Sequence, residues 1–394
     1  MRGTLFAVFA ALAILSAVAC ERGTGGTAVS AAKDAAVNWT PEATPLVMGA
    51  VVSLTGPESS FGISTKQGIE LAVSQANASG GVKGQPVSLK IHDDRSVPSE
   101  AAAATRQLID EDNVRVVLGE ILSASSLAMA NVAQAAKVPM ITPSSTNPKV
   151  TAGRDWVSRV CFIDSFQGYA MARFAREHLK VTRAAILHGM SDYSVGLANV
   201  FTKQFTERGG NIVQVRSYTK GDSGFHAQLT AIRNAKPEVV YVPGYYTDVG
   251  NISRQAREVG LVVPLLGADG WDAAKLYELG GGAVEGHYFS THYSPQDPSP
   301  KTQRFIAEYK ARFGTIPDAI AALGYDAALV ALDAMKRANS LERAAIRDAI
   351  AQTRDLSGAT GNITLDEERN AVKPAVIVQV TQGASRYVTA IAPP

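Results

Sequence analysis

Residues 114–126 join the apolar run Val114-Arg115-Val116-Val117-Leu118 to the loop Gly119-Glu120-Ile121-Leu122-Ser123-Ala124-Ser125-Ser126. Residues 138–148 repeat the arrangement, with Val138-Pro139-Met140-Ile141-Thr142 followed by Pro143-Ser144-Ser145-Thr146-Asn147-Pro148. In an open parallel sheet the carboxyl ends of adjacent strands face one crevice, and a helix that starts there offers free N–H groups and a positive dipole end. The two stretches therefore predict a site for a small anionic group, in particular a carboxylate.

The same alternation of short β-branched runs with helical patterns extends along most of the chain. We expect strands at residues 46–53, 87–92, 114–118, 138–142, 184–188, 211–216, 239–242 and 263–266. We expect helices at residues 64–79, 99–112, 125–136, 167–178, 196–208, 224–234 and 248–259. This order is typical of βαβ units around parallel sheets, so the predicted fold class is α/β.

The strands and helices form two series, at about residues 46–163 and 164–290. Two series of this length predict two similar lobes, each a doubly wound parallel sheet. The helical stretch at residues 301–352 does not fit as a simple extension of the second series.

The amino terminus has the pattern of a secretory signal. Arg2 precedes an apolar stretch of 15 residues, 5–19, which is shorter than the roughly 20 residues a helix needs to cross a bilayer. The stretch ends in Ala17-Val18-Ala19-Cys20, a small-residue cleavage pattern. Residues 1–19 are therefore the expected signal peptide, with Cys20 as a lipid acceptor or, alternatively, as the plain first residue after cleavage. Residues 20–45, rich in Gly, Ala and Thr, are the expected flexible tether.

Charge and cysteine content exclude some classes of partner. The net charge is +2, and loss of Arg2 leaves +1, which is too balanced to indicate nucleic acid or an anionic membrane surface as a partner. The expected link to a membrane is therefore a lipid anchor at Cys20 alone. The only other cysteine is Cys161, so we expect a small buried hydrophobe and no intrachain disulfide.

The sequence contains no convincing catalytic or cofactor-binding motif. Gly221-Asp222-Ser223-Gly224 resembles a serine-protease loop, but the alternating α/β context makes a turn and helix cap the better interpretation. The six histidines include no His-Glu-x-x-His pair, and no P-loop or dinucleotide fingerprint occurs. We therefore expect no enzyme, no cofactor and no metal site, and any ATP hydrolysis must come from partner subunits.

Several further segments follow one another in a familiar order: Leu54-Thr55-Gly56-Pro57, the glycine-rich run at residues 77–84, Asp93-Asp94 and Gly244-Tyr245-Tyr246. Together with the two hydroxyl-bearing loops, they resemble the leucine/isoleucine/valine-binding proteins, the extracytoplasmic receptors of branched-chain amino acid ABC importers. The resemblance covers nearly all of residues 46–390. It implies the type I periplasmic-binding fold, with lobe I at residues 46–163 and 291–360 and lobe II at residues 164–290 and 361–394. It also implies a three-stranded hinge, with strands near residues 361–365 and 375–380 finishing lobe II.

The resemblance also implies a role for each residue of an amino acid site. Ser123 and Thr146 match positions that hold the α-carboxylate, and the backbone carbonyl of Ser144 matches one that receives the ammonium. Asp269 aligns with the acidic ammonium partner. The remaining positions are aromatic: Tyr193 and Tyr245 match ligand-facing tyrosines of lobe II, and Phe61 matches an aromatic pocket wall.

Structural alternatives remain for these residues. Hydroxyls after strands are often helix caps, which would account for Ser123 and Thr146. The tyrosines could be core or rim aromatics, and Asp269 before Gly270 could be a turn residue. Glu120 has two open interpretations: it pairs with structure behind the site, or it extends the ammonium clamp.

The expected function is that of an exported, periplasmic and lipid-tethered binding protein. It captures a branched-chain or other neutral amino acid by closing its lobes and delivers it to the permease subunits of an ABC transporter. The alternative from another class is a sensory subunit of similar fold that reports amino acid or amide occupancy to a signalling partner. An exported α/β hydrolase is disfavoured because no triad motif is present.

Overall fold

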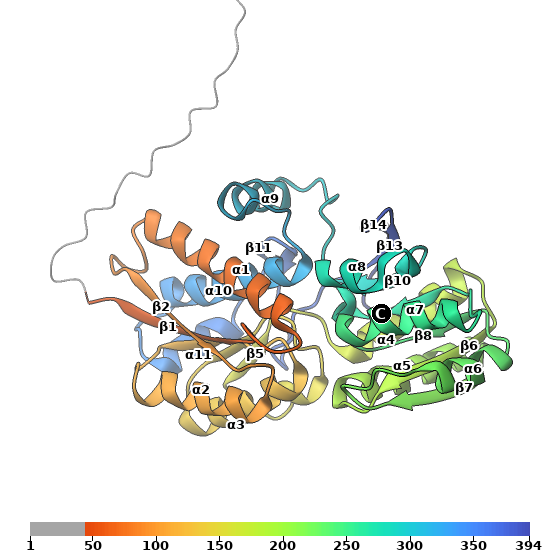
Figure 1. Ribbon diagram of the computed structural model, residues 1–394. Coiled ribbons are helices and arrows are strands. Elements are labelled where there is room, and N and C mark those ends of the chain that lie inside the picture. The colour runs from red at the N-terminus through yellow and green to blue at the C-terminus, as the bar shows by residue number, and fades with distance from the viewer. Residues whose placement is uncertain (1–43) are drawn as a thin grey trace, which may run out of the picture. The chain divides into compact units, whose positions relative to one another are not determined.

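The computed structural model describes residues 44–394. The expected signal segment, Cys20 and all but the last two residues of the expected tether lie outside the described residues. Two β-sheets with flanking helices account for most of the described chain, and they define two lobes (Figure 1).

The first lobe is built on a five-stranded sheet in the order β2-β1-β3-β4-β5, with every neighbouring pair parallel. Its strands are β1 (Leu46–Val52), β2 (Val87–Asp93), β3 (Val116–Leu118), β4 (Met140–Thr142) and β5 (Val157–Arg159). Because β3 and β4 are direct neighbours, the two hydroxyl-bearing loops that follow them lie side by side at one edge of the sheet.

Helices cover this sheet on both faces, as a doubly wound sheet requires. They are α1 (Ser59–Ala78), α2 (Pro98–Asp110), α3 (Ser123–Ala136), α9 (Pro300–Phe313), α10 (Ala319–Arg337) and α11 (Arg343–Ala351). One buried cluster unites β1 and α1 with α10, and a second unites β3 with α2 and α3. The helical stretch that did not fit the second series therefore belongs to the first lobe.

The crossing of α1 and α10 depends on two glycines. A Cβ atom at Gly68 would lie 2.0 Å from the carbonyl oxygen of Ala321, and one at Gly324 would lie 2.5 Å from that of Thr65. Both distances are too short for any side chain, so glycine lets the two backbones approach closely. Figure 1 shows α10, in blue, running along α1, in orange.

The second lobe is built on a seven-stranded sheet in the order β14-β13-β10-β9-β8-β6-β7. Its parallel strands are β6 (Arg183–Gly189), β7 (Asn211–Tyr218), β8 (Val239–Tyr241), β9 (Leu265–Gly267) and β10 (Tyr288–Thr291), and the antiparallel hairpin β13 (Ala375–Thr381) and β14 (Ala384–Ile391) extends one edge. Its helices are α4 (Asp164–Arg173), which continues as a π-helical turn at Phe174–His178, α5 (Asp192–Glu207), α6 (His226–Asn234), α7 (Tyr246–Glu258) and α8 (Ala274–Gly280). Short 3-10 turns at Pro148–Val150, Asp269–Trp271 and Gly281–Val284 complete the elements.

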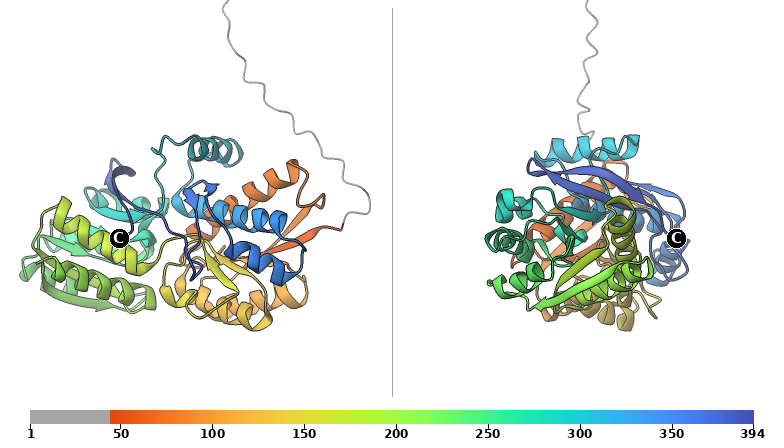
Figure 2. Two further views of the ribbon diagram at one scale, coloured as in Figure 1. Left: turned by 180° about the vertical axis from the view of Figure 1, so that it is seen from behind. Right: turned by 90° about the vertical axis from the view of Figure 1, so that its right-hand side faces the viewer.

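The chain passes between the lobes three times, through residues 160–163, 292–299 and 364–374. Seen from behind in Figure 2, the first-lobe elements in orange and yellow and the second-lobe elements in green form separate groups, with blue segments in both. This confirms the predicted two-lobe α/β fold with three connections.

One expected strand lies elsewhere. Residues 361–365 were expected to finish the second lobe, but β12 (Gly361–Ile363) pairs with β11 (Leu356–Gly358) in a separate two-stranded sheet. Ile363 and Leu365 are buried in the cluster around α1 and α10, because their apolar side chains complete the first lobe's core. Strands β5, β10, β11 and β14 were not predicted from the sequence.

Candidate functional site

All seven predicted ligand-contact residues line a single cavity. The first lobe contributes Phe61, Ser123, Ser144 and Thr146, and the second contributes Tyr193, Tyr245 and Asp269. Ile121, Gly270 and Ile320 complete the lining. Residues up to about 200 positions apart in the sequence thus converge because each follows, or lies near, the carboxyl end of a parallel strand.

On the first-lobe side of the cavity, two buried hydroxyl groups lack hydrogen-bond partners among the described residues. Ser123 opens α3, Ser144 and Thr146 lie in the loop after β4, and all three are buried. Ser144 Oγ and Thr146 Oγ1 have no hydrogen-bond partner among the described residues. Because a buried hydroxyl without a partner costs about 1–3 kcal/mol, these two atoms need a ligand or water as a partner.

The cap interpretation of these hydroxyls is not supported by the geometry. The N-cap position of α3 is Leu122, and no side chain caps that helix. The short turn at Pro148–Val150 is capped by Asn147 rather than by Thr146. The N-terminus of α3 therefore presents its first N–H groups, beside Ser123, as an anion-binding surface.

The second-lobe side is organised around Asp269, which begins the turn after β9 and is 4% exposed. Its Oδ1 accepts hydrogen bonds from Tyr193 Oη at 2.8 Å and from Gln167 Nε2 at 2.9 Å. Its Oδ2 lies 3.1 Å from His292 Nε2. Burial lowers the pKa of His292, so this ring is mainly neutral near pH 7 and does not balance the carboxylate charge.

His292 is the only group within ion-pair distance of Asp269 in the part of the chain that the structure describes. A buried carboxylate without a cationic partner is costly in free energy. The cavity therefore favours a guest that brings a positive charge to Asp269.

The tyrosines form a stacked pair across this side of the cavity. The rings of Tyr193 and Tyr245 have centroids 5.0 Å apart and an interplanar angle of 12°. Tyr193 Oη also accepts a hydrogen bond from the backbone N–H of Gly270 at 3.0 Å, so its hydroxyl is fixed in place. Tyr245 meets Phe61 edge to face at 6.3 Å, and these two rings together form an apolar wall.

Sequence reasoning missed Asp164, a second buried carboxyl near the site. Its backbone N–H donates to the carbonyl of Thr146 at 2.9 Å, and neither of its carboxyl oxygens has a hydrogen-bond partner among the described residues. Burial and the charge of Asp269 raise the pKa of Asp164 to about 8. In the sequence Asp164 looks like an ordinary acidic residue in the first turn of a helix. No local pattern distinguishes such a residue from a buried carboxyl near a binding site.

Ile320 was also missed. It lies at the start of α10, far along the chain, and reaches the cavity only because α10 returns to the first lobe. With Ile121 and Phe61 it makes one end of the cavity apolar, and the three belong to a cluster that includes second-lobe residues such as Trp271.

Glu120 does not line the cavity, which answers the question left open by the sequence. It is fully buried behind the Ser123 loop, where its Oε1 accepts from Ser53 Oγ at 3.0 Å and its Oε2 accepts from the N–H of Leu122 at 2.6 Å. Burial and the nearby carboxylate of Asp94 raise the pKa of Glu120 well above its usual value. The residue therefore supports the loop from behind and is not an ammonium partner.

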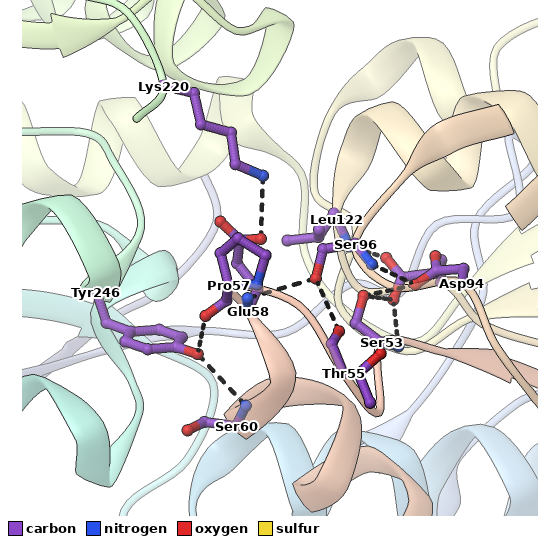
Figure 3. A network of polar contacts seen from close by, with 11 residues as sticks. Ser53, Thr55, Pro57, Glu58, Ser60, Asp94, Ser96, Leu122, Lys220 and Tyr246 are labelled. Carbon is purple, nitrogen blue, oxygen red and sulfur yellow. Dashed lines mark hydrogen bonds and ion pairs between the residues drawn. The ribbon is translucent and has the colours of Figure 1, made fainter. Parts of the chain in front are cut away.

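The lobes also contact each other beside the cavity. Lys220 Nζ of the second lobe lies 3.0 Å from Glu58 Oε2 of the first (Figure 3). Tyr246 Oη donates to the carbonyl of Pro57 at 3.0 Å and accepts from the N–H of Ser60 at 3.3 Å. The structure thus shows the two lobes in direct contact beside the cavity.

Between residues 44 and 394, no group of three or more His, Cys, Asp or Glu side chains is arranged to hold a metal ion. None of the helices within that range has the length and hydropathy needed to cross a bilayer. Cys161 is a free, buried thiol.

Two α/β lobes that enclose a polar cavity at the carboxyl ends of their strands define a two-lobed ligand-binding protein. Residues 45–385 match the family model of the periplasmic binding proteins. A Leu/Ile/Val-binding protein homolog of Brucella melitensis biotype 1 is 31% identical over 84% of this chain and 89% of its own length. The chain therefore belongs to this family, and specifically to its branched-chain amino acid binding proteins.

Solved structures agree with this assignment. A leucine-binding protein of Thermotoga maritima is 43% identical, with a TM-score of 0.84 over 88% of this chain and 99% of its own. The branched-chain amino acid transporter substrate-binding protein of Streptococcus pneumoniae, in complex with isoleucine, is 30% identical, with a TM-score of 0.84 over 89% of this chain and all of its own. These relatives are solute-binding proteins and not enzymes, which confirms that prediction, and the family implies an exported, periplasmic protein.

Proposed function

We propose that this protein captures a neutral α-amino acid, most favourably a branched-chain one, between its two lobes and delivers it to the permease of an ABC importer. The observation that carries the proposal is that one cavity contains both a carboxylate without a cationic partner and hydroxyl groups without hydrogen-bond partners. Asp269 has no cationic partner within ion-pair distance, and the hydroxyls of Ser144 and Thr146 have no partner among the described residues. An α-amino acid supplies an ammonium for the first and a carboxylate for the second.

The carboxylate is held by the first lobe. Ser123 and Thr146 offer hydroxyl donors, and the start of α3 adds backbone N–H groups with a favourable dipole. No lysine or arginine lines the cavity, so neutral donors carry this interaction.

The ammonium lies toward the second lobe. Asp269 accepts it directly, with Gln167 and Tyr193 orienting the carboxylate, and the backbone carbonyl of Ser144 faces it from the first lobe. Asp164 supplies a second acidic group nearby.

The side chain of the ligand meets the apolar end of the cavity, formed by Phe61, Ile121 and Ile320. Such a wall favours an aliphatic side chain, because transfer of apolar surface from water is worth roughly 25 cal/mol per Å². The leucine and isoleucine named for the Thermotoga and Streptococcus proteins support the same ligand class.

A thermal-unfolding screen of the purified protein against the twenty amino acids tests the ligand class, followed by calorimetry on the hits. A ligand at 100 times its dissociation constant stabilises the native state by about 2.7 kcal/mol, which gives a clear rise in Tm. We expect leucine, isoleucine and valine to give the largest shifts. A screen in which no amino acid raises Tm contradicts the proposal.

The coupling to transport requires a separate experiment. The reconstituted permease and ATPase subunits of the proposed importer are expected to import labelled ligand only when the loaded binding protein is added. A ligand-dependent change in a signalling partner without import would instead support the sensory alternative.

We further propose that Cys20 is lipidated, which would keep the protein at the outer face of the cytoplasmic membrane. The support is the sequence Ala17-Val18-Ala19-Cys20 followed by a glycine-rich segment. Mass spectrometry of the mature protein checks this directly, with Cys20→Ser as the unlipidated control. A mature amino terminus that carries no lipid contradicts it.

A further inference from the structure

The loop between β4 and β5 contains the two cavity residues Ser144 and Thr146, and one buried cation holds it in shape. Arg159, the last residue of β5, is fully buried. Its Nη1 donates to the carbonyl of Ser145 at 2.6 Å, and its Nη2 donates to the carbonyl of Asn147 at 2.9 Å. The guanidinium thus binds the backbone of the loop on both sides of Thr146.

These contacts decide which backbone acceptor remains for a ligand. The carbonyls of Ser145 and Asn147 are occupied by Arg159, and that of Thr146 is occupied by the N–H of Asp164. No described residue donates a hydrogen bond to the carbonyl of Ser144. Of four consecutive carbonyls, the one that stays available belongs to a residue that lines the cavity.

We propose that Arg159 is a positioning residue for amino acid recognition: by holding the carbonyls of Ser145 and Asn147, it leaves the Ser144 carbonyl free for the ligand's ammonium and points Thr146 at the carboxylate. This inference rests on the proposed function. Arg159 is absent from the cavity lining, so it touches the loop that carries Ser144 and Thr146 and not the ligand itself.

The chemistry of the side chain supports this role. A guanidinium is planar and presents donors in a fixed fork, so it can hold two carbonyls at once in one geometry. A lysine ammonium can be near both carbonyls but cannot impose the same orientation. Arg159 forms no ion pair within the described chain: its terminal nitrogens donate to carbonyl and hydroxyl oxygens, and its Nε has no hydrogen-bond partner among the described residues.

Arg159 also ties the loop to the third crossover between the lobes. Its Nη2 donates to Thr151 Oγ1 at 2.9 Å, and Thr151 Oγ1 donates to Asn370 Oδ1 at 2.8 Å. The backbone N–H of Arg159 donates to the carbonyl of Arg369 at 3.0 Å. The ligand-facing loop is therefore anchored to residues that lead directly into the hinge.

Arg159→Lys tests the proposal through two ligands that differ only in the group the Ser144 carbonyl would accept. Calorimetry compares L-leucine with 2-hydroxy-4-methylpentanoate, which keeps the carboxylate and side chain but lacks the ammonium. If the screen selects another neutral amino acid, that amino acid and its hydroxy analogue replace the pair. Weakening of a hydrogen bond to a charged group predicts that leucine binds about tenfold weaker or worse.

The ratio of the two affinities distinguishes a specific effect on the Ser144 carbonyl from a general loss of order in the loop. In the Arg159→Lys protein we expect the preference for leucine over its hydroxy analogue to shrink. The matched control is Arg154→Lys, because Arg154 donates to the Val150 carbonyl in the adjacent turn and to Asn131, outside the cavity. That control should leave both affinities unchanged.

Unchanged leucine binding, or equal losses for both ligands, overturns the role of Arg159. If Arg159→Lys does not fold, Thr151→Val decides: it removes one anchor of the guanidinium and should reduce the same ratio by a smaller factor, whereas an unchanged ratio overturns the role. A wild-type protein that binds no amino acid overturns the proposed function itself, so the two failures are distinguishable.

Discussion

Tyr193 Oη donates to Asp269 Oδ1 at 2.8 Å and accepts from the N–H of Gly270 at 3.0 Å. The phenol therefore holds the carboxylate and the backbone that follows it in one fixed arrangement. Since a preorganised carboxylate loses less freedom on binding, this bridge supports the proposed role of Asp269 as the partner of a ligand's ammonium.

Asp269→Ala is expected to weaken amino acid binding about 30-fold or more. Removal of one partner from a buried charge pair typically costs about 2–5 kcal/mol. Calorimetry measures the change, with Asp155→Ala as the control because Asp155 is a surface carboxylate remote from the cavity lining. An unchanged dissociation constant for Asp269→Ala removes Asp269 from the site.

Ser123→Ala and Thr146→Ala should each weaken binding of the amino acid by about tenfold or more, since a hydrogen bond to a charged group is worth roughly 1.5–3 kcal/mol. The loss should nearly vanish for an amidated analogue, which has no carboxylate. Ser125→Ala is the matched control: Ser125 is buried in the same helix but does not line the cavity. Equal losses for acid and amide would mean that neither hydroxyl recognises the carboxylate.

Ligand binding near pH 7 should release a proton from Asp164. Without ligand this carboxyl stays mostly protonated, because burial and the charge of Asp269 raise its pKa to about 8. An arriving ammonium favours the ionised form and lowers that pKa, so affinity should rise with pH until about pH 8. Calorimetry in buffers of different ionisation enthalpy detects the released proton, and Asp164→Asn should abolish the buffer dependence. A binding enthalpy that is the same in every buffer for the wild-type protein contradicts this role.

Lys220→Met should destabilise the closed arrangement of the lobes. Glu58 would remain buried without its cation, although the half-exposed lysine limits the effect to about three- to tenfold in affinity. Lys203→Met is the control, because Lys203 pairs with Glu207 within one helix of the second lobe. Small-angle scattering should show the wild-type protein becoming more compact with leucine, and the Lys220→Met protein needing more leucine to do so. An unchanged radius of gyration at saturation would remove closure as the mechanism, unless the free protein already rests closed.

Local sequence patterns were sufficient to predict the α/β fold and the place of the two hydroxyl-bearing loops. Each hydroxyl loop directly follows a buried strand, so the positions of Ser123 and Thr146 follow from the parallel sheet alone. The assignment of Asp269 and the tyrosines needed the family resemblance. Ile320 could not be predicted, since it reaches the cavity only through the packing of α10 on α1.

Buried polar groups were harder to place than strands. Asp164 and Glu120 are both acidic residues next to apolar runs, yet one lies beside Asp269 and the other lies behind a loop. Only tertiary contacts distinguish them. Residues 361–365 were misplaced for a related reason: a short apolar strand fits either lobe until its neighbours are known.

The return of α10 to the first lobe has a consequence for how the protein is made. The five strands of the first sheet are complete once Arg159 has been synthesised, but the helix that packs against Gly68 follows only after nearly all of the second lobe. Until then the small-residue face of α1 has no partner, and exposed apolar surface of this kind promotes aggregation. The first lobe therefore completes its core late in synthesis, after most of the second lobe has been made.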